Sequence, residues 1–191
     1  PQADVRLMES ELHCWGANYS GQLGLQIYDQ IRKSPERTFA SRHHLQQVVA
    51  GQKHTCLMYS DGTTAVAAVT CAGSNDSGQL GVDVPLDPLH NLGGERSAYF
   101  LNVQGLPAYT TLVQLRAGQR HNCGLFRKQF GSAPAAYSVY CWGDNSNGQL
   151  GNGSTIDQRT PVAVTASGVL SGAVEQVAAG AGHSCAVSAD V

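Results

Sequence analysis

Two short sequence signatures, each present three times in alternating order, constrain this chain more than any other feature. The first has the form Cys-x-Gly-x-Asn-x-x-Gly-Gln-Leu-Gly and begins at Cys14, Cys71 and Cys141. The second has the form Ala-Gly-x-x-His-x-Cys and begins at Ala50, Ala117 and Ala179. Recurrence of this kind is typical of repeat architectures, in which each unit buries its apolar face against its neighbours. The chain is therefore predicted to be a repeat protein.

Each unit has the pattern of β-structure. A short apolar run precedes each Ala-Gly, a second follows each His, and a third leads into the next Cys. Asp61-Gly62 separates the second run from the third in one unit and predicts a hairpin turn, because Gly supplies the positive φ that such turns need. No window of about 12 residues has a convincing helical period. Several strands in each unit are typical of propeller blades.

The repeats divide a single domain, residues 1–191, into whole and partial units. We expect a half-blade at 1–24, repeat units at about 47–81 and 112–151, and a terminal half-blade at 174–191. The segments 25–46 and 82–109 exceed what a blade needs and are expected to be loop insertions, the second because it is rich in Pro and Gly. The predicted fold is all-β, with about three propeller-blade equivalents and incomplete half-blades at both ends.

Both signatures resemble the regulator of chromosome condensation repeat, which builds seven-bladed β-propellers. The resemblance covers nearly the whole chain outside the two insertions and implies the propeller fold. It leaves function open, because that family includes a nuclear nucleotide-exchange factor, a plant ultraviolet receptor, ubiquitin-ligase modules and secreted β-lactamase-inhibitory proteins.

The six cysteines occur only at repeat positions, one in each His-x-Cys and one in each Cys-x-Gly. If neighbouring strands of a hairpin carry Cys56 and Cys71, their Cα atoms lie about 4.5–5.5 Å apart, which a disulfide accepts. Cys123 and Cys141 hold the same positions in the next unit. The even count favours disulfides, and the alternative is small buried core residues. Disulfides indicate an oxidising compartment, so we expect an extracellular or secreted protein.

The remaining cysteines, Cys14 and Cys185, belong to complementary halves of one blade. Three explanations stay open. The chain is part of a longer propeller, or it closes on itself, or the end of one chain is completed by the start of the next through a Cys185–Cys14 disulfide. In the third case the partner is an identical subunit, and the head-to-tail contact builds a ring or a filament.

The recurring His and Trp residues are expected to be structural. His54, His121 and His183 occur once per blade, which indicates a repeated hydrogen bond rather than catalysis. Trp15 and Trp142 lie in the Cys-Trp-Gly signature and are predicted to be packing residues.

Three Asn-x-Ser sequons are candidate glycosylation sites, at Asn18, Asn75 and Asn152. The first two hold the same place in successive repeats, on a turn that we expect to be exposed. The alternative is that Asn favours this turn whether or not it carries sugar.

Composition excludes several classes of function. A net charge of −2 with 14% charged residues argues against a polyanion-binding surface, so nucleic acid is not expected as a partner. No stretch approaches the roughly 20 apolar residues of a membrane span. The start at Pro1, without a basic-then-apolar leader, fits either a processed chain or part of a longer one. No catalytic motif, metal-ligand spacing or cofactor motif is present.

These observations favour a non-enzymatic extracellular protein with a structural or interaction role, as the subunit of a head-to-tail assembly. The alternatives are a secreted protein-binding or inhibitory module that uses its loops, and a fragment of a larger seven-bladed propeller.

Overall fold

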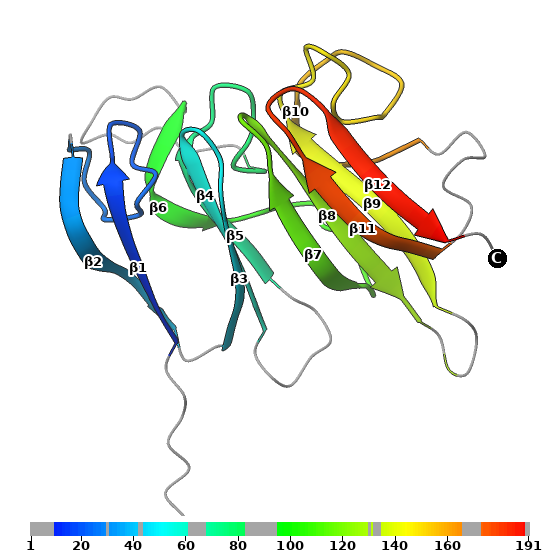
Figure 1. The fold of residues 1–191 in the computed structure, drawn as a ribbon, viewed down its shortest axis with the longest axis horizontal. Coiled ribbons are helices and arrows are strands. Elements are labelled where there is room, and N and C mark those ends of the chain that lie inside the picture. Colours follow the sequence, from blue (N-terminus) through cyan, green and yellow to red (C-terminus); the bar gives the residue numbers. More distant parts are fainter. Residues whose placement is uncertain are drawn as a thin grey trace, which may run out of the picture.

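The fold is a row of four antiparallel β-sheets that stand side by side in chain order (Figure 1). The computed structural model describes residues 10–29, 31–41, 44–60, 68–82, 95–129, 131, 135–165 and 173–189. Within these ranges every regular element is a strand, twelve in all, and no helix is present that could cross a membrane. The predicted all-β architecture is confirmed.

The two central sheets have four strands each, in sequence order, and are called blades B and C here. Blade B consists of β3 (His44–Ala50), β4 (His54–Ser60), β5 (Ala68–Ser74) and β6 (Arg96–Asn102). Blade C consists of β7 (Thr111–Ala117), β8 (His121–Lys128), β9 (Ala136–Gly143) and β10 (Gln158–Ala163). In each blade the three strands predicted from the apolar runs are present, and a fourth strand follows them.

The two outer sheets have two strands each. Half-blade A consists of β1 (Ser10–Ala17) and β2 (Ile31–Ser41), and half-blade D consists of β11 (Ala173–Ala179) and β12 (Ser184–Ala189). By repeat position, half-blade A matches the last two strands of a blade, and half-blade D matches the first two. The two half-blades lie at opposite ends of the row and form separate sheets (Figure 1), so the described strands do not close into a ring.

The expected loop insertions contain regular structure, which corrects the sequence analysis. β2 lies within 25–46 and pairs with β1, while β6 lies within 82–109 and pairs with β5. Both pairings contain register shifts, and β2 includes Pro35 and four charged residues, a composition that an edge strand tolerates. The alternation of apolar and polar residues that is expected of a strand is therefore weak in β2 and β6. The Asp61-Gly62 turn and the Pro- and Gly-rich part of the second segment, 83–94, lie outside the described residues.

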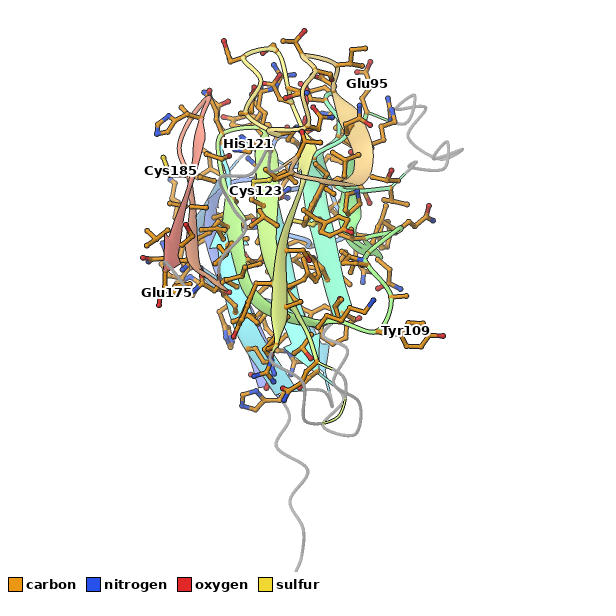
Figure 2. All side chains as sticks on the ribbon, turned by 90° about the vertical axis from the view of Figure 1, so that its right-hand side faces the viewer. Glu95, Tyr109, His121, Cys123, Glu175 and Cys185 are labelled. Atoms are coloured by element: carbon orange, nitrogen blue, oxygen red, sulfur yellow. A yellow bond between two sulfur atoms is a disulfide. The ribbon has the colours of Figure 1, made fainter. Side chains whose placement is uncertain are left out.

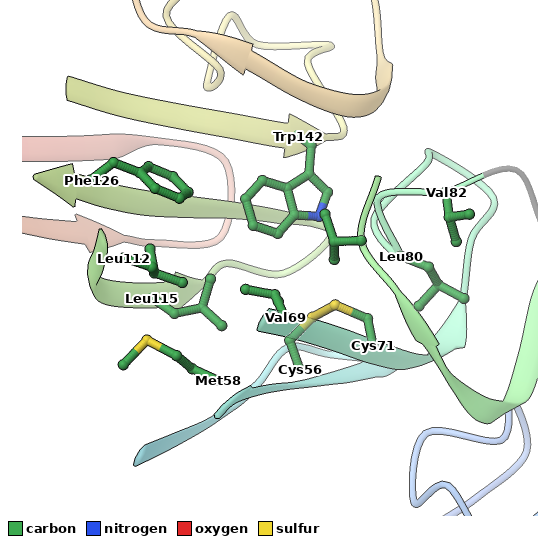
Figure 3. Packing of buried hydrophobic residues seen from close by; sticks show 11 residues of the cluster. Cys56, Met58, Val69, Cys71, Leu80, Val82, Leu112, Leu115, Phe126 and Trp142 are labelled. Atoms are coloured by element: carbon green, nitrogen blue, oxygen red, sulfur yellow. A yellow bond between two sulfur atoms is a disulfide. The ribbon is translucent and has the colours of Figure 1, made fainter. Parts of the chain in front are cut away.

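Two hydrophobic clusters lie between neighbouring sheets. The larger lies between blades B and C, where Trp142 and Leu115 of blade C pack against Met58, Val69 and Leu80 of blade B (Figure 3). The smaller lies between blade C and half-blade D and includes Leu150, Val164 and Val177. Burial between sheets is the main source of stability in a stacked-repeat architecture.

Candidate interaction site at the two half-blades

Each complete blade is crosslinked by one disulfide between its second and third strands. Cys56 and Cys71 are directly opposed in the β4–β5 ladder, with Cα atoms 4.1 Å apart, and Cys123 and Cys141 have the same separation in β8–β9. All four side chains are buried. These are the two bridges that the hairpin argument predicts.

The Ala-Gly-x-x-His signature forms a tight loop between the first and second strands. The amide of Gly51 donates to the carbonyl of His54 at 2.8 Å, and the equivalent bond occurs at Gly118 and His121. A Cβ atom at Gly51 would overlap the His54 ring, so the imidazole needs Gly at that position. The signature therefore serves to place a buried histidine at the end of each blade.

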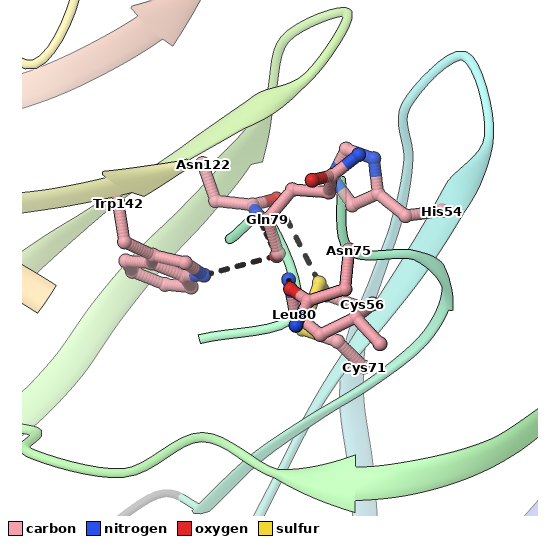
Figure 4. Close-up of a disulfide and its surroundings, with 8 residues drawn as sticks. All are labelled: His54, Cys56, Cys71, Asn75, Gln79, Leu80, Asn122 and Trp142. Atoms are coloured by element: carbon pink, nitrogen blue, oxygen red, sulfur yellow. Dashed lines mark hydrogen bonds between the residues drawn. A yellow bond between two sulfur atoms is a disulfide. The ribbon is translucent and has the colours of Figure 1, made fainter. Parts of the chain in front are cut away.

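That histidine connects its blade to the next one. The ring Nε2 of His54 lies 3.0 Å from Oδ1 of Asn122, and Nδ2 of Asn122 donates to the carbonyl of Gln79 at 2.8 Å (Figure 4). The same carbonyl accepts a bond from the Trp142 indole at 3.2 Å. Since Asn122 is oriented by its bond to Gln79, its oxygen faces His54, and His54 must carry its proton on Nε2. The predicted structural hydrogen bond exists here and joins two blades.

Burial controls the protonation of these histidines. Desolvation lowers the pKa of His54 to about 4, against the weaker opposing effect of its bond to Asn122. Desolvation also lowers the pKa of His121, whose Nε2 lies 2.9 Å from the hydroxyl of Ser184 in half-blade D. Both rings are therefore neutral at pH 7, which suits a structural hydrogen bond.

A second repeated contact uses glutamines that the sequence analysis did not single out. The side-chain amide of Gln47 in β3 binds both the N–H (3.0 Å) and the carbonyl (2.9 Å) of Leu115 in β7. Gln114 in β7 binds β11 in the same way, through the N–H of Val177 and the carbonyl of Glu175. Each glutamine lies three residues before the alanine of the Ala-Gly pair. This fixed offset is the sequence signal that could have revealed the contact.

Arg120 adds a charged contact between blades B and C. Its guanidinium lies 2.8 Å from the Asp76 carboxylate and donates to the hydroxyl of Ser77. Although desolvation opposes the shift, hydrogen bonds from Gln79 and Ser74 and the charge of Arg120 leave the pKa of Asp76 below its usual value.

The turns that carry Asn18 and Asn75 are not exposed as expected, because both side chains are fully buried, which argues against glycosylation at these two sequons. Oδ1 of Asn75 accepts the N–H of Leu80, and its Nδ2 donates to the carbonyl of Val82, so the amide holds the Gln-Leu-Gly turn from inside. Asn18 does the same through Leu23 and Ile27. Asn152 is only partly buried, and glycosylation there stays a prediction.

Half-blade A presents residues that are buried elsewhere in the repeat. Trp15 in β1 is 62% exposed, whereas its equivalent Trp142 is 0% exposed. In the neighbouring blade B, Val48 in β3 is 52% exposed, although its equivalent Leu115 is fully buried. Cys14 is half-buried and unpaired, and burial raises the pKa of its thiol.

Half-blade D, at the opposite end of the row (Figure 1), presents the complementary set, which includes Cys185 (Figure 2). Cys185 is exposed and unpaired, and Val187 is 54% exposed where its equivalent Leu125 is buried. Gln176 and His183 are exposed. Within the described part of the chain, neither has the inter-blade partner that its equivalents in blades B and C have. The predicted structural roles of His183 and Trp15 are therefore not fulfilled within one molecule.

A cavity of about 300 Å³ lies between blade C and half-blade D. It is lined by the Gln149-Leu150-Gly151 turn, by Val164 and Val177, and by Cys185 and its neighbours. No group of three or more His, Cys, Asp or Glu side chains that could hold a metal ion occurs in the described ranges. The arrangement is suited to strand and side-chain docking.

The geometry defines the chain as a segment of a β-propeller with an open half-blade at each end. Models of the regulator of chromosome condensation (RCC1) repeat match residues 9–58, 46–79 and 138–187. The chain belongs to the RCC1 repeat family, as the signatures predicted.

Known proteins resemble it over most of its length. The probable E3 ubiquitin-protein ligase HERC4 of Mus musculus is 30% identical over 178 residues, which cover 93% of this chain and 14% of that relative. The ultraviolet-B receptor UVR8 of Arabidopsis thaliana is 28% identical over 197 residues, covering 97% of this chain and 37% of the receptor.

Among solved structures, Prp20p of Saccharomyces cerevisiae superposes with a TM-score of 0.72 at 19% identity, covering 95% of this chain and 40% of that one. This likeness shows the propeller fold. Prp20p is described together with its binding to Gsp1p and histones. The chain thus spans between about a seventh and two fifths of these relatives.

Proposed function

We propose that this chain is a non-enzymatic, extracellular structural protein that binds protein partners through its open half-blades and assembles head to tail with copies of itself. The two disulfides buried in blades B and C support an oxidising location. The membership of the RCC1 repeat family supports a role in protein interaction.

One observation carries the proposal. Cys14 and Cys185, the two unpaired cysteines of the described residues, hold the same repeat positions as the two partners of each intra-blade disulfide. Cys14 corresponds to Cys71, and Cys185 corresponds to Cys56. If β1 of one copy pairs with β12 of another, the two sulfurs come into the geometry that both complete blades have.

Strand pairing between copies would also cover the exposed edges of the two half-blades. Among the described strands, β12 has a neighbour on one side only, β11, and β1 has only β2. An uncovered strand edge leaves backbone N–H and C=O groups available to another chain. A completed blade of β11, β12, β1 and β2 would have the strand order of blades B and C.

Oxidation of the protein, followed by electrophoresis on a non-reducing gel, tests the proposal. The full 191-residue chain is incubated with oxidised glutathione, which accepts the two electrons and two protons released when the Cys14 and Cys185 thiols join. We expect a ladder of covalent multimers that collapses to one band with dithiothreitol.

Two single variants control for random crosslinking. Cys14→Ser and Cys185→Ser each lack one member of the pair, so both should stay monomeric when the pairing is specific, whereas random crosslinking would give a dimer of either variant through its remaining thiol. A ladder of equal length in either variant, or a single monomer band for the unaltered chain, would contradict the proposal.

A larger propeller is the second candidate, favoured by the greater length of the relatives. In that case β12 is completed by a later segment of a longer chain. The 191-residue chain would then give no specific Cys14–Cys185 linkage in the same experiment.

A further inference from the structure

The cavity beside β12 resembles a space that a tryptophan fills elsewhere in the same molecule. Between blades B and C, the Trp142 indole packs on the Gln79-Leu80-Gly81 turn and donates to the Gln79 carbonyl (Figures 3 and 4). Between blade C and half-blade D, the equivalent turn is Gln149-Leu150-Gly151, and it borders the cavity.

Five positions of the two linings correspond. The smaller cluster has Cys123, Val139, Cys141, Leu150 and Val177 where the larger has Cys56, Val69, Cys71, Leu80 and Leu115. The larger cluster also contains Trp142, for which the smaller has no counterpart among the described residues. Gly151 is exposed although its equivalent Gly81 is buried beside the indole. An apolar cavity of about 150 Å³ holds benzene, so about 300 Å³ admits an indole.

An aromatic ring also covers this turn at the first interface of the row. Ala72 stands at the Trp position in blade B, and there the Phe100 ring of β6 contacts Gly24, the last residue of the equivalent turn. Two of the three turns are therefore capped by an aromatic side chain, and the third faces a cavity.

The same chain carries an exposed indole in a matching backbone. Trp15 lies between Cys14 and Gly16 as Trp142 lies between Cys141 and Gly143, and both glycines have φ of +106°. Trp15 is on β1, at the opposite end of the row from β12 (Figure 1), so one molecule does not fill its own cavity.

Two polar contacts would accompany the indole. Gln176 is equivalent to Gln47 and Gln114, which bind the backbone of the next first strand, so it is placed to bind β3 of a second copy near Val48. His183 is equivalent to His54 and His121, and its partner in β4 of the second copy would be the hydroxyl of Thr55, at the position of Asn122 and Ser184.

We propose that the cavity between blade C and half-blade D is a binding site for the Trp15 indole of a second copy, which donates its N–H to the Gln149 carbonyl while Gln176 and His183 hold the first two strands of that copy's blade B. This site deepens the proposed head-to-tail assembly and rests on it. It provides an affinity between copies that does not depend on the Cys14–Cys185 bond.

Complementation between two blocked variants tests the site. The background is the full chain with Cys14→Ser and Cys185→Ser, so that association is non-covalent. Trp15→Ala removes the indole and keeps the cavity. Ala186→Trp places a bulky side chain at the exposed cavity residue Ala186 and keeps Trp15. Tyr109→Asn, at an exposed residue outside both half-blades, is the matched control.

Association is measured by light scattering after size-exclusion chromatography over a range of concentrations. We expect the background and Tyr109→Asn proteins to form multimers, and each blocked variant alone to associate at least about a hundredfold more weakly, since a central buried Trp dominates an interface. An equimolar mixture of the blocked variants should form dimers and nothing larger. Circular dichroism confirms that each variant keeps its β-structure.

The outcomes separate this site from the proposed function. If Trp15→Ala associates as strongly as the background, the indole site is wrong although the assembly stands. If the background stays monomeric while the unaltered chain forms covalent ladders, the cysteines alone join the copies and the indole site is again wrong. If neither associates, the assembly and the site are both wrong.

Discussion

Trp142→Ala provides a quantitative test of how the repeats are held together. The indole is fully buried between blades B and C, and truncation of a core Trp costs about 3–5 kcal/mol of stability. Its hydrogen bond to the Gln79 carbonyl adds about 1 kcal/mol. Because Asn122 still donates to that carbonyl, the acceptor is not left unpaired. We expect a loss of about 4–6 kcal/mol in the free energy of unfolding.

Trp15→Ala is the matched comparison, since the residue lies in the same motif but is largely exposed. In a monomer it should change stability by no more than about 0.5 kcal/mol. Trp142→Phe keeps most of the apolar volume and loses the N–H donor, so it should cost about 1–2 kcal/mol and remains measurable if the alanine variant does not fold.

Urea titration followed by circular dichroism gives these free energies, at low concentration and in the Cys14→Ser, Cys185→Ser background that prevents crosslinking. Equal losses for Trp142→Ala and Trp15→Ala would refute the reasoning, because the two residues differ in burial and in little else.

Four further outcomes follow from the structure. The pKa of His54 is lowered to about 4, so the unfolded chain binds more protons than the folded chain between pH 6.5 and 4. The stabilising contribution should be complete above pH 6.5, and stability should fall by about 3 kcal/mol as the pH drops to 4. Urea titrations of His54→Gln should show a flatter dependence of stability on pH. The Cys56–Cys71 disulfide joins positions 15 residues apart, so Cys56→Ala with Cys71→Ala should cost about 3 kcal/mol by the same measurement, and a deficit near zero would contradict a role in stability. Asn75→Ala breaks two buried hydrogen bonds and should cost about 2–4 kcal/mol of stability. When the unaltered chain is secreted from a eukaryotic host, glycosidase treatment should leave the mass of the peptides with Asn18 and Asn75 unchanged. A glycan on either residue of the folded protein would contradict their burial.

The sequence was sufficient for the parts of the fold that repeat. The two signatures correctly predict the first three strands of each blade, because each strand carries an apolar run next to a fixed Gly, His or Cys. The pairing of Cys56 with Cys71 follows from the same argument, since residues on adjacent hairpin strands are directly opposed. The two half-blades also follow from counting which half of a unit contains Cys14 and which contains Cys185.

The features that the sequence did not reveal depend on contacts between units. β2 and β6 are outer strands with irregular registers, and neither shows alternating burial: β2 is exposed or partly exposed along 31–40, and in β6 the buried residues are the adjacent Ser97 and Ala98. Asn18 and Asn75 have the sequence of exposed turn residues, yet each amide is turned inward to hold its own loop. Gln47 has the sequence of an ordinary polar strand residue, because its hydrogen-bond partner, the backbone of Leu115, belongs to the next blade.

The capacity of one copy to complete another is tested most directly by mixing chains of two isotopic masses. Equal amounts of unlabelled and nitrogen-15-labelled protein are combined in reductant, oxidised together and digested without reduction. Mass spectrometry should find the Cys14 and Cys185 peptides disulfide-linked, with about half of the pairs containing one light and one heavy partner. Free thiols at both positions, or linked pairs that are only all-light or all-heavy, would contradict assembly between separate molecules.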